Sequence, residues 1–371
     1  MTELENAQIA LKDEKFEVAQ GNFEAQTKRD PLCLEAHIGL GDAGFGLGDY
    51  EAADTAYRRA LELDPRSADA LFGLAATLRV SESYEEAVML YEKGFEAEPE
   101  RTEAYWELAY SREMNGDKTG AEEAYRSCLT HHPNHGMAAH LLAAMTGAKT
   151  KRAPENYVRD LFDDYAETFD SDLVEGLNYV VPQIIAKTLS AFTSEHPPAG
   201  TPAFQSVLDL GCGTGLVAEA VRPFAGHITG VDLSEKMLEV ATSKGRIDER
   251  VVSDMIEFLG GSVEEVGGYD LIVSGDALVY LGDLEPLFAG VNAHLNPDGL
   301  FCFTIEDLPA GDFELMPTGR FAHNARYIDA LIASTGLAVD RHEAIVPRTD
   351  SNEEIPGRLY LISKKPRRRK D

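Results

Sequence analysis

Three glycines and two aspartates stand at spacings that could hold a ligand with a ribose. An apolar segment ends in Asp209 and runs into a loop with Gly211, Gly213 and Gly215. Glycine lets a backbone approach a ligand closely, and the helix expected after the loop offers free N–H groups at its start. A second apolar segment ends in Asp232, 21 residues after Gly211. A carboxylate at the end of a second strand can accept hydrogen bonds from both ribose hydroxyls.

The spacing inside the glycine loop separates two ligands that share this layout. A dinucleotide-binding loop reads G-x-G-x-x-G and sets a phosphate against the helix start. This loop reads G-x-G-x-G behind an acid, Asp209, which suits a ligand with an amino group better than a pyrophosphate. The string LDLGCGTG at 208–215 closely resembles motif I of class I methyltransferases. The resemblance implies S-adenosylmethionine as the cofactor.

The same resemblance assigns further cofactor contacts along the chain. It implies a cofactor contact from the residue directly after the ribose acid and another from the residue that ends the fourth strand. After the third strand it implies an acid and an apolar wall for adenine. These residues are Leu233, Asp254, Met255 and Ser274, with Gly275 and Asp276 next at the mouth of the pocket.

Two residues after the expected fifth strand are candidates for catalysis. Methyl transfer from a sulfonium is an in-line displacement, so the protein mainly aligns donor and acceptor and excludes water. A general base is needed only when the acceptor must lose a proton. We expect His323, with Tyr327 four residues later, over the pocket mouth as base or substrate contact. The alternative for His323 is a surface or packing role.

The first 150 residues carry an internal repeat. Proline recurs at 31, 65, 99 and 133, a spacing of 34 residues each time. Each interval predicts two amphipathic helices, with small residues where they cross and proline where the next unit starts. The pattern resembles the tetratricopeptide repeat. A degenerate repeat precedes Pro31, and a closing helix is expected at 134–145.

Repeats of this kind stack into a superhelix with a concave face lined by first-helix side chains. We expect a peptide or a partner protein to bind there. The alternative is a structural appendage that buries part of its groove against the second domain or another subunit. The expected groove residues are Ile38, Asp42, Phe45, Phe72, Arg79, Trp106, Tyr110 and Glu113.

Three segments resemble a smaller group within the class I methyltransferases. The strings at 161–182, 277–288 and 320–328 are similar to a bacterial group of predicted methyltransferases with tetratricopeptide repeats. The catalytic half also resembles the Williams–Beuren-region methyltransferase-like proteins. In those relatives the first segment folds over the cofactor as a lid, which implies cofactor contacts for Tyr165 and Tyr179, with Phe169 nearby. Packing of helix on sheet is the alternative for these aromatics. Asp172 stands where many members have His, so its role is open.

The predicted fold class has two domains. The first is an all-α tetratricopeptide-repeat superhelix, and the second is an α/β Rossmann-like class I methyltransferase sheet with a helical lid. The expected bounds are repeats with a capping helix at 1–147, a linker at 148–156, a lid segment at 157–203, and the methyltransferase domain with a basic tail at 204–371.

The composition of the chain argues against nucleic acid as a partner and against a membrane-spanning or secreted protein. The net charge is −30, from 34 basic and 64 acidic residues, and such a surface repels nucleic acid. The basic end at 364–370 is a solvated tail or a docking patch for an acidic partner. No apolar stretch reaches the roughly 18 residues of a membrane span, and the N-terminus lacks a signal pattern, so a cytoplasmic location is expected. The four cysteines are widely spaced, which predicts neither a metal site nor a disulfide.

The loop after the fourth strand narrows the class of methyl acceptor that we expect. It reads SGDA, in place of the Asn/Asp-Pro-Pro-Tyr/Phe motif typical of enzymes that methylate adenine or amide nitrogen. We therefore expect a small-molecule acceptor. Two alternatives stay open: the repeats recruit a protein that the catalytic half methylates, or the chain is a non-catalytic adaptor that binds S-adenosylmethionine.

Overall fold

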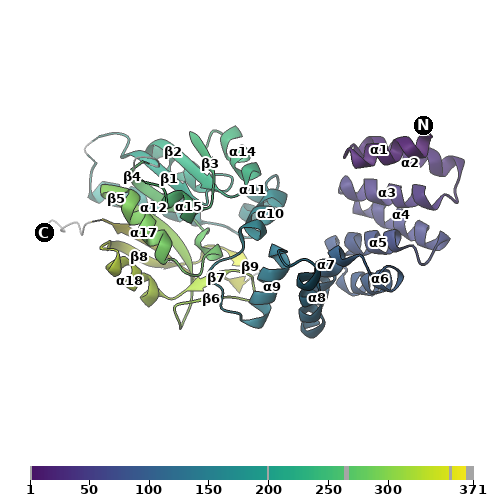
Figure 1. Cartoon of the computed structure of the whole chain (residues 1–371). Helices are drawn as coiled ribbons and strands as arrows, with labels where there is room; N and C mark the ends of the chain where they lie inside the picture. The colour runs from purple at the N-terminus through teal and green to yellow at the C-terminus, as the bar shows by residue number, and fades with distance from the viewer. Residues whose placement is uncertain (1, 199, 263–266, 351–352, 365–371) are drawn as a thin grey trace. The chain divides into compact units, whose positions relative to one another are not determined.

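The chain folds into two compact units, which are described separately. The computed structural model describes residues 2–198, 200–262, 267–350 and 353–364. The units are Met1–Met145 and Thr146–Asp371. Figure 1 shows helices throughout the first and a sheet flanked by helices in the second. The predicted basic tail falls, apart from Lys364, outside the described residues.

The first unit is a series of helix pairs. Within residues 3–131, helices that follow one another along the chain pack together. The second helices of the repeats begin behind Asp49, Ser83 and Asp117. The helices are α1 (Glu3–Lys12), α2 (Phe16–Arg29), α3 (Leu34–Gly46), α4 (Tyr50–Leu63), α5 (Ala68–Val80), α6 (Tyr84–Ala97), η1 (Thr102–Ala104), α7 (Tyr105–Met114), α8 (Lys118–His131) and α9 (Gly136–Thr146).

Buried tyrosines fix the helix crossings. A Cβ added at Gly41 would stand 2.5 Å from the ring of Tyr57, so the small residue is a steric requirement. The Tyr57 hydroxyl donates a hydrogen bond of 2.6 Å to Asp42. Tyr125 likewise donates a bond of 2.8 Å to Glu113. Two acids expected in the groove are therefore held by tyrosines of the core.

Other expected groove residues also contact the unit itself. Phe72 is buried in its core, and Ile38 and Phe45 pack against that core. The guanidinium of Arg79 lies over the ring of Trp106, 5.2 Å from its centroid. These contacts give the residues a packing role within the repeats.

The second unit is built on a mixed sheet of order β3-β2-β1-β4-β5-β11-β8. Strands β3, β2, β1, β4 and β5 run parallel, and β11 is antiparallel to β5 and β8. A hairpin of β6 and β7 extends the sheet beside the end of β5. The strands are β1 (Phe204–Leu210), β2 (Ala225–Asp232), β3 (Glu249–Val252), β4 (Tyr269–Ser274), β5 (Leu295–Asp307), β6 (Phe313–Leu315), β7 (Phe321–His323), β8 (Ala338–Ile345), β11 (Gly357–Ser363) and the separate pair β9 (Thr349–Asp350) and β10 (Glu353–Glu354).

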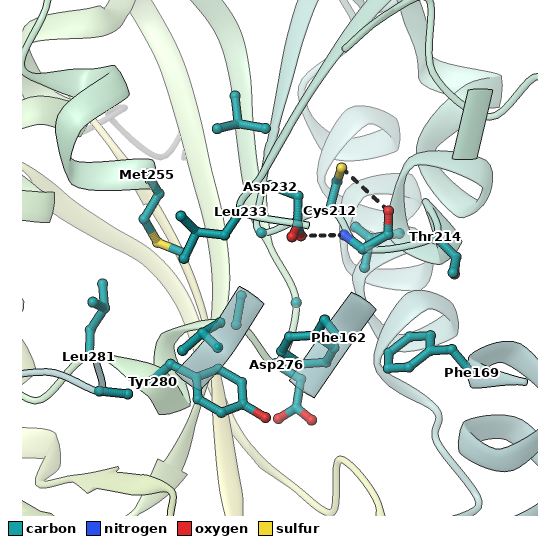
Figure 2. A pocket seen from close by; sticks show the side chains of 18 of the residues that line it. Phe162, Phe169, Cys212, Thr214, Asp232, Leu233, Met255, Asp276, Tyr280 and Leu281 are labelled. Atoms are coloured by element: carbon teal, nitrogen blue, oxygen red, sulfur yellow. Dashed lines mark hydrogen bonds between the residues drawn. The ribbon is translucent and has the colours of Figure 1, made fainter. Parts of the chain in front are cut away.

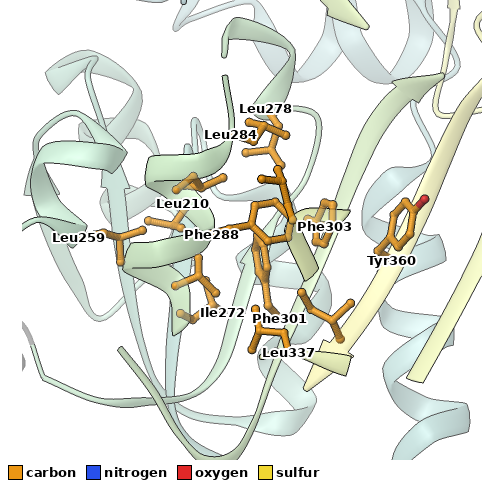
Figure 3. Packing of buried hydrophobic residues seen from close by; sticks show 14 of the residues in the cluster. Leu210, Leu259, Ile272, Leu278, Leu284, Phe288, Phe301, Phe303, Leu337 and Tyr360 are labelled. Atoms are coloured by element: carbon orange, nitrogen blue, oxygen red, sulfur yellow. The ribbon is translucent and has the colours of Figure 1, made fainter. Parts of the chain in front are cut away.

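Helices cover both faces of this sheet because its central strands are apolar on both sides. Alternate residues of one strand serve the two cores: Phe301 and Phe303 face one, and Cys302 faces the other. Figure 3 shows Phe288 of a covering helix packed against Phe301 and Phe303. The helices are α10 (Glu155–Tyr165), α11 (Phe169–Ser171), η2 (Asp172–Gly176), α12 (Val181–Glu195), α13 (Leu216–Val221), η3 (Arg222–Phe224), α14 (Glu235–Ser243), α15 (Met255–Leu259), η4 (Leu278–Tyr280), α17 (Glu285–His294) and α18 (Ala325–Ser334).

The predicted architecture is confirmed: a unit of paired helices precedes an α/β unit with a Rossmann-like sheet. Two segments differ in detail between the prediction and the structure. The 148–156 segment is bound to the second unit, because Ala153 N donates to Tyr280 O at 2.9 Å and Arg152 pairs with Leu281. In the 157–203 segment, α12 belongs to the sheet core rather than to a lid. Within the described residues, no helix is both long and apolar enough to cross a membrane.

Candidate active site

A cavity of about 1040 Å³, its open mouth included, lies at the carboxyl ends of β1, β2 and β4. The strand order reverses between β1 and β4, and open α/β sheets bind ligands at such a point. Figure 2 shows Asp232 and Met255 on one side of the cavity, with Phe162 and Phe169 across from them. Of the predicted cofactor residues, seven line it: Tyr179, Gly211, Gly213, Asp232, Leu233, Asp254 and Met255.

The glycine loop has the conformation that the motif requires. Gly211, Gly213 and Gly215 all have positive φ, of 66°, 52° and 83°. A Cβ at Gly213 would come no closer than 3.9 Å to another group, Phe169, so its absence leaves space inside the cavity. Gly215 does not line the cavity; a Cβ there would meet Arg246 at 2.9 Å. Its role is to let α13 begin close to the neighbouring chain.

Asp232 is placed to bind a diol. One carboxylate oxygen accepts a hydrogen bond of 2.8 Å from Gly213 N, and the other accepts one of 2.9 Å from Ser234 N. Burial raises the pKa of Asp232 above its usual value, while these N–H groups lower it. Each oxygen keeps a second lone pair for a ligand hydroxyl.

Asp209 lies under the glycine loop rather than in the cavity wall. Its side chain is 1% exposed, and neither oxygen accepts a hydrogen bond of normal geometry. Burial raises its pKa to about 7, and the charge of Asp232 adds to the shift. The Ala218 backbone lowers the pKa, but among the described residues this buried acid has no counter-charge, so it fits a cationic ligand group. The loop, Asp232 and Asp209 therefore fit the ribose and the ammonium group of S-adenosylmethionine.

Asp254 lines the cavity, but its carboxylate is engaged. One oxygen caps α15 by accepting bonds from Ile256 N and Glu257 N, at 2.9 and 3.1 Å. The other accepts a bond of 2.6 Å from Arg152. Because this second oxygen accepts one bond only, it keeps a lone pair for a ligand, and Asp254 lines the cavity together with Met255, an apolar wall, and Arg152.

The aromatic lid is present in part. Phe162 and Phe169 line the cavity with rings 5.9 Å apart, edge to face, and Tyr179 lies beside them, with its hydroxyl 3.4 Å from Gly275 O. Tyr165 is 47% exposed and outside the lining. Ser274 is also outside, because its hydroxyl points back to Leu210 O at 2.9 Å.

The two predicted catalytic residues lie outside the cavity lining. His323 is fully buried and donates from Nε2 to Gly282 O at 3.1 Å. Burial lowers its pKa to about 4, so it is neutral at pH 7. The Tyr327 hydroxyl accepts a bond of 2.9 Å from Leu284 N. Both side chains organise the loop before α17, and the structure does not bring them to the site.

The cavity also has a polar residue expected at its mouth, Asp276, and two to which the sequence analysis gave no role. Asp276 lines it in a left-handed conformation, with φ of 59°, and its N–H donates to Thr304 at 2.9 Å. Tyr280 and Arg320 line it as well. Both stand inside segments quoted for the family resemblance, but no local signal there marks a pocket residue. Within the described parts of the chain, no group of His, Cys, Asp or Glu could hold a metal ion.

Family models match both units. A methyltransferase domain model covers residues 208–301. A TPR repeat model covers 41–79, and a tetratricopeptide repeat model covers 4–53 and 78–135.

Relatives of known name match the second unit in part. A probable S-adenosylmethionine-dependent methyltransferase of Saccharomyces cerevisiae is 32% identical over 104 residues, 27% of this chain and 35% of the relative. A malonyl-[acyl-carrier protein] O-methyltransferase of Chlorobium phaeovibrioides is 33% identical over 129 residues, 34% of this chain and 48% of the relative. The chain thus spans less than half the length of these two relatives.

Among solved structures, magnesium protoporphyrin IX methyltransferase from Synechocystis with bound S-adenosylmethionine aligns with 57% of this chain and 97% of its own. Its sequence identity is 16% and its TM-score 0.41. The family models identify both parts of the chain. The chain carries a methyltransferase domain behind a set of tetratricopeptide repeats.

Proposed function

We propose that the protein transfers a methyl group from S-adenosylmethionine to a small molecule bound in the cavity under the lid. One observation carries this proposal. A single cavity is lined by the glycine loop, by Asp232, by the loop after β4 and by the aromatic residues of α10 and α11. A mostly apolar cavity with a few placed polar groups is typical of small-ligand sites.

Different residues of the cavity bind different parts of the cofactor. Asp232 takes the ribose, Met255 lies against the adenine, and Asp209 attracts the ammonium group through the glycine loop. Bound there, S-adenosylmethionine supplies a methyl group on a positively charged sulfur. Phe162 and Phe169 exclude water from the reacting groups, and the β4 loop with Asp276 borders the space left for the acceptor.

The repeats support a second function, in which they recruit a protein that the catalytic unit methylates. The family models match repeats over most of the first unit, and such repeats commonly bind proteins. The small molecule is favoured because Phe162 and Phe169 line the same cavity as the β4 loop, so an acceptor there lies among aromatic side chains, as small ligands commonly do.

A labelling experiment separates these functions. The full-length protein is incubated with S-adenosylmethionine tritiated in its methyl group and with the small-molecule or the macromolecular fraction of a cell extract. We expect label in the small-molecule fraction with the wild type and none with Asp232→Ala. Label in protein alone supports the second function. No transfer to either fraction supports the non-catalytic adaptor and contradicts both.

A further inference from the structure

Two arginines stand near the floor of the cavity, and their partners differ. Arg348 is 0% exposed; its Nη1 contacts both oxygens of Asp276, at 2.6 and 2.5 Å, and its Nη2 contacts Glu306. Arg348 is therefore an ion-pair partner of both acids. Arg320 lines the cavity itself, and among the residues that the structure describes it forms no ion pair.

The surroundings of Arg320 fix where its charge lies. It ends the turn between β6 and β7, where Met316 N donates to Arg320 O at 2.8 Å. The next residues, Phe321–His323, form β7, which pairs with the end of β5. Its side chain interacts with the hydroxyl of Tyr280, whose ring packs edge to face on Phe162 at 5.4 Å. Burial alone would lower the pKa of Arg320, but Tyr280, Asp276 and Glu306 raise it, so it stays charged.

A charged guanidinium that lines a largely apolar cavity, and that has no ion pair of its own among the described residues, can bind an anionic group of a ligand. Its planar set of N–H donors matches the two oxygens of a carboxylate. The Tyr280 hydroxyl can add a third hydrogen bond. Figure 2 shows the polar ends of Tyr280 and Asp276 directed toward one another, below Phe162. This end of the cavity therefore combines an anion-binding group with an aromatic wall.

We propose that Arg320, together with Tyr280, binds a carboxylate of the methyl acceptor. The inference rests on the proposed function of the cavity. A carboxylate held by an arginine is a weak nucleophile, because its lone pairs are engaged; it serves as a handle, and the methyl group goes to another atom of the acceptor. The amino-acid tail of the cofactor is a second source of a carboxylate, and the test below separates the two sources.

The test uses the full-length protein saturated with S-adenosylhomocysteine. Aromatic carboxylic acids and their primary amides are compared pair by pair by saturation-transfer NMR and titration. We expect the acids to bind about tenfold more tightly than the amides. Arg320→Met should abolish this preference, Arg320→Lys should retain part of it, and the control Arg341→Met, whose partner Glu195 lies on the surface, should leave it unchanged. Thermal unfolding checks that each variant is folded.

Three outcomes bear on the proposal differently. Equal binding of acids and amides by the wild type, or the same preference in Arg320→Met, overturns it. A second comparison uses 5′-methylthioadenosine, which lacks the amino-acid tail. If Arg320→Met weakens S-adenosylhomocysteine but not this nucleoside, the carboxylate is that of the cofactor and the acceptor assignment is overturned. If S-adenosylhomocysteine does not bind the wild type, the proposed function fails, and the acid–amide comparison is then made without it.

Discussion

Arg246 Nη1 donates a hydrogen bond of 2.7 Å to the carboxylate of Asp170. Lys244 Nζ donates another of 2.6 Å to the same oxygen, and Thr214 donates to the second oxygen. Asp170 belongs to α11 of the lid, whereas Thr214 belongs to the glycine loop. The lid is therefore fastened to the loop beneath it by a charged cluster.

Breaking this cluster should loosen the lid. We expect Asp170→Asn to weaken S-adenosylhomocysteine about 5- to 30-fold, mainly through faster dissociation, since a charge-assisted bond contributes roughly 1–2 kcal/mol. Although burial alone raises the pKa of Asp170, the bonds from Lys244, Thr214 and Arg246 lower it below 3.8. Its contribution is thus present above pH 3.8 and lost only as the pH falls through the lowered value.

Stopped-flow dissociation at pH 6 to 8 measures this effect. Asp172→Asn is the matched control, because Asp172 lies two residues away and is exposed. Equal dissociation rates for Asp170→Asn and the wild type would show that the charged cluster does not hold the lid over the ligand.

Asp209 should make both stability and binding depend on pH. Its folded pKa of about 7 lies above the usual 3.8, so its contribution to stability is complete below pH 3.8 and is lost as the pH rises through 7. Asp209→Asn should therefore raise the unfolding temperature of the ligand-free protein by about 2–8 °C at pH 8, and by less at pH 6. The exposed Asp164→Asn should change neither value.

The same variant should lose affinity for S-adenosylhomocysteine. Because the ammonium group favours the carboxylate form, wild-type affinity should be about tenfold lower at pH 6 than at pH 8. Calorimetry at both pH values checks this slope. A wild-type affinity that does not change with pH, or an Asp209→Asn variant that binds normally, speaks against the assigned partner.

Arg348 should be essential for stability rather than for ligand contact. Arg348→Met leaves Asp276 and Glu306 without their common counter-charge, and removal of one partner from a buried network costs about 3–5 kcal/mol. Arg358→Met removes a partly exposed pair with Asp307 and should cost about 0–1 kcal/mol. Urea unfolding compares the two variants. A similar loss for both would show that the buried network is dispensable.

The repeats offer a matched pair of glycine substitutions. Gly41→Ala would place a methyl group 2.5 Å from the Tyr57 ring and should destabilise the protein by about 1–3 kcal/mol. Gly21, also inside a helix, has nothing within 4 Å of an added Cβ, so Gly21→Ala should stabilise it by about 0.5–1 kcal/mol. Thermal unfolding, monitored by circular dichroism, measures the change in stability of both variants. A neutral Gly41→Ala would mean that Tyr57 can move aside.

The features predicted well from the sequence are local. The glycine loop and the ribose acid are written into short strings that end apolar segments, and the structure puts Gly211, Gly213 and Asp232 around one cavity. The repeat recurs at a fixed period, so small residues such as Gly41 could be matched to helix crossings.

The features that were not predicted depend on distant parts of the chain. Arg348 and Asp276 are 72 residues apart, and Arg320 reaches the cavity only because β7 pairs with β5. His323 was expected at the pocket mouth because it comes after the fifth strand, and the short strand that it ends was not predicted. In the structure, however, the side chain of His323 is buried against Gly282, since a short strand can direct its last side chain to either face.

The most direct test is calorimetric titration of the full-length protein with S-adenosylmethionine, S-adenosylhomocysteine and NADH, alongside Asp232→Ala. The account predicts micromolar binding of the two sulfur nucleotides, no binding of NADH, and a loss of at least about fiftyfold in the variant, because both ribose hydroxyls lose a charged acceptor. Thermal unfolding confirms that the variant is folded. Binding of NADH instead, binding of none of the three, or an Asp232→Ala variant with wild-type affinity would contradict the account.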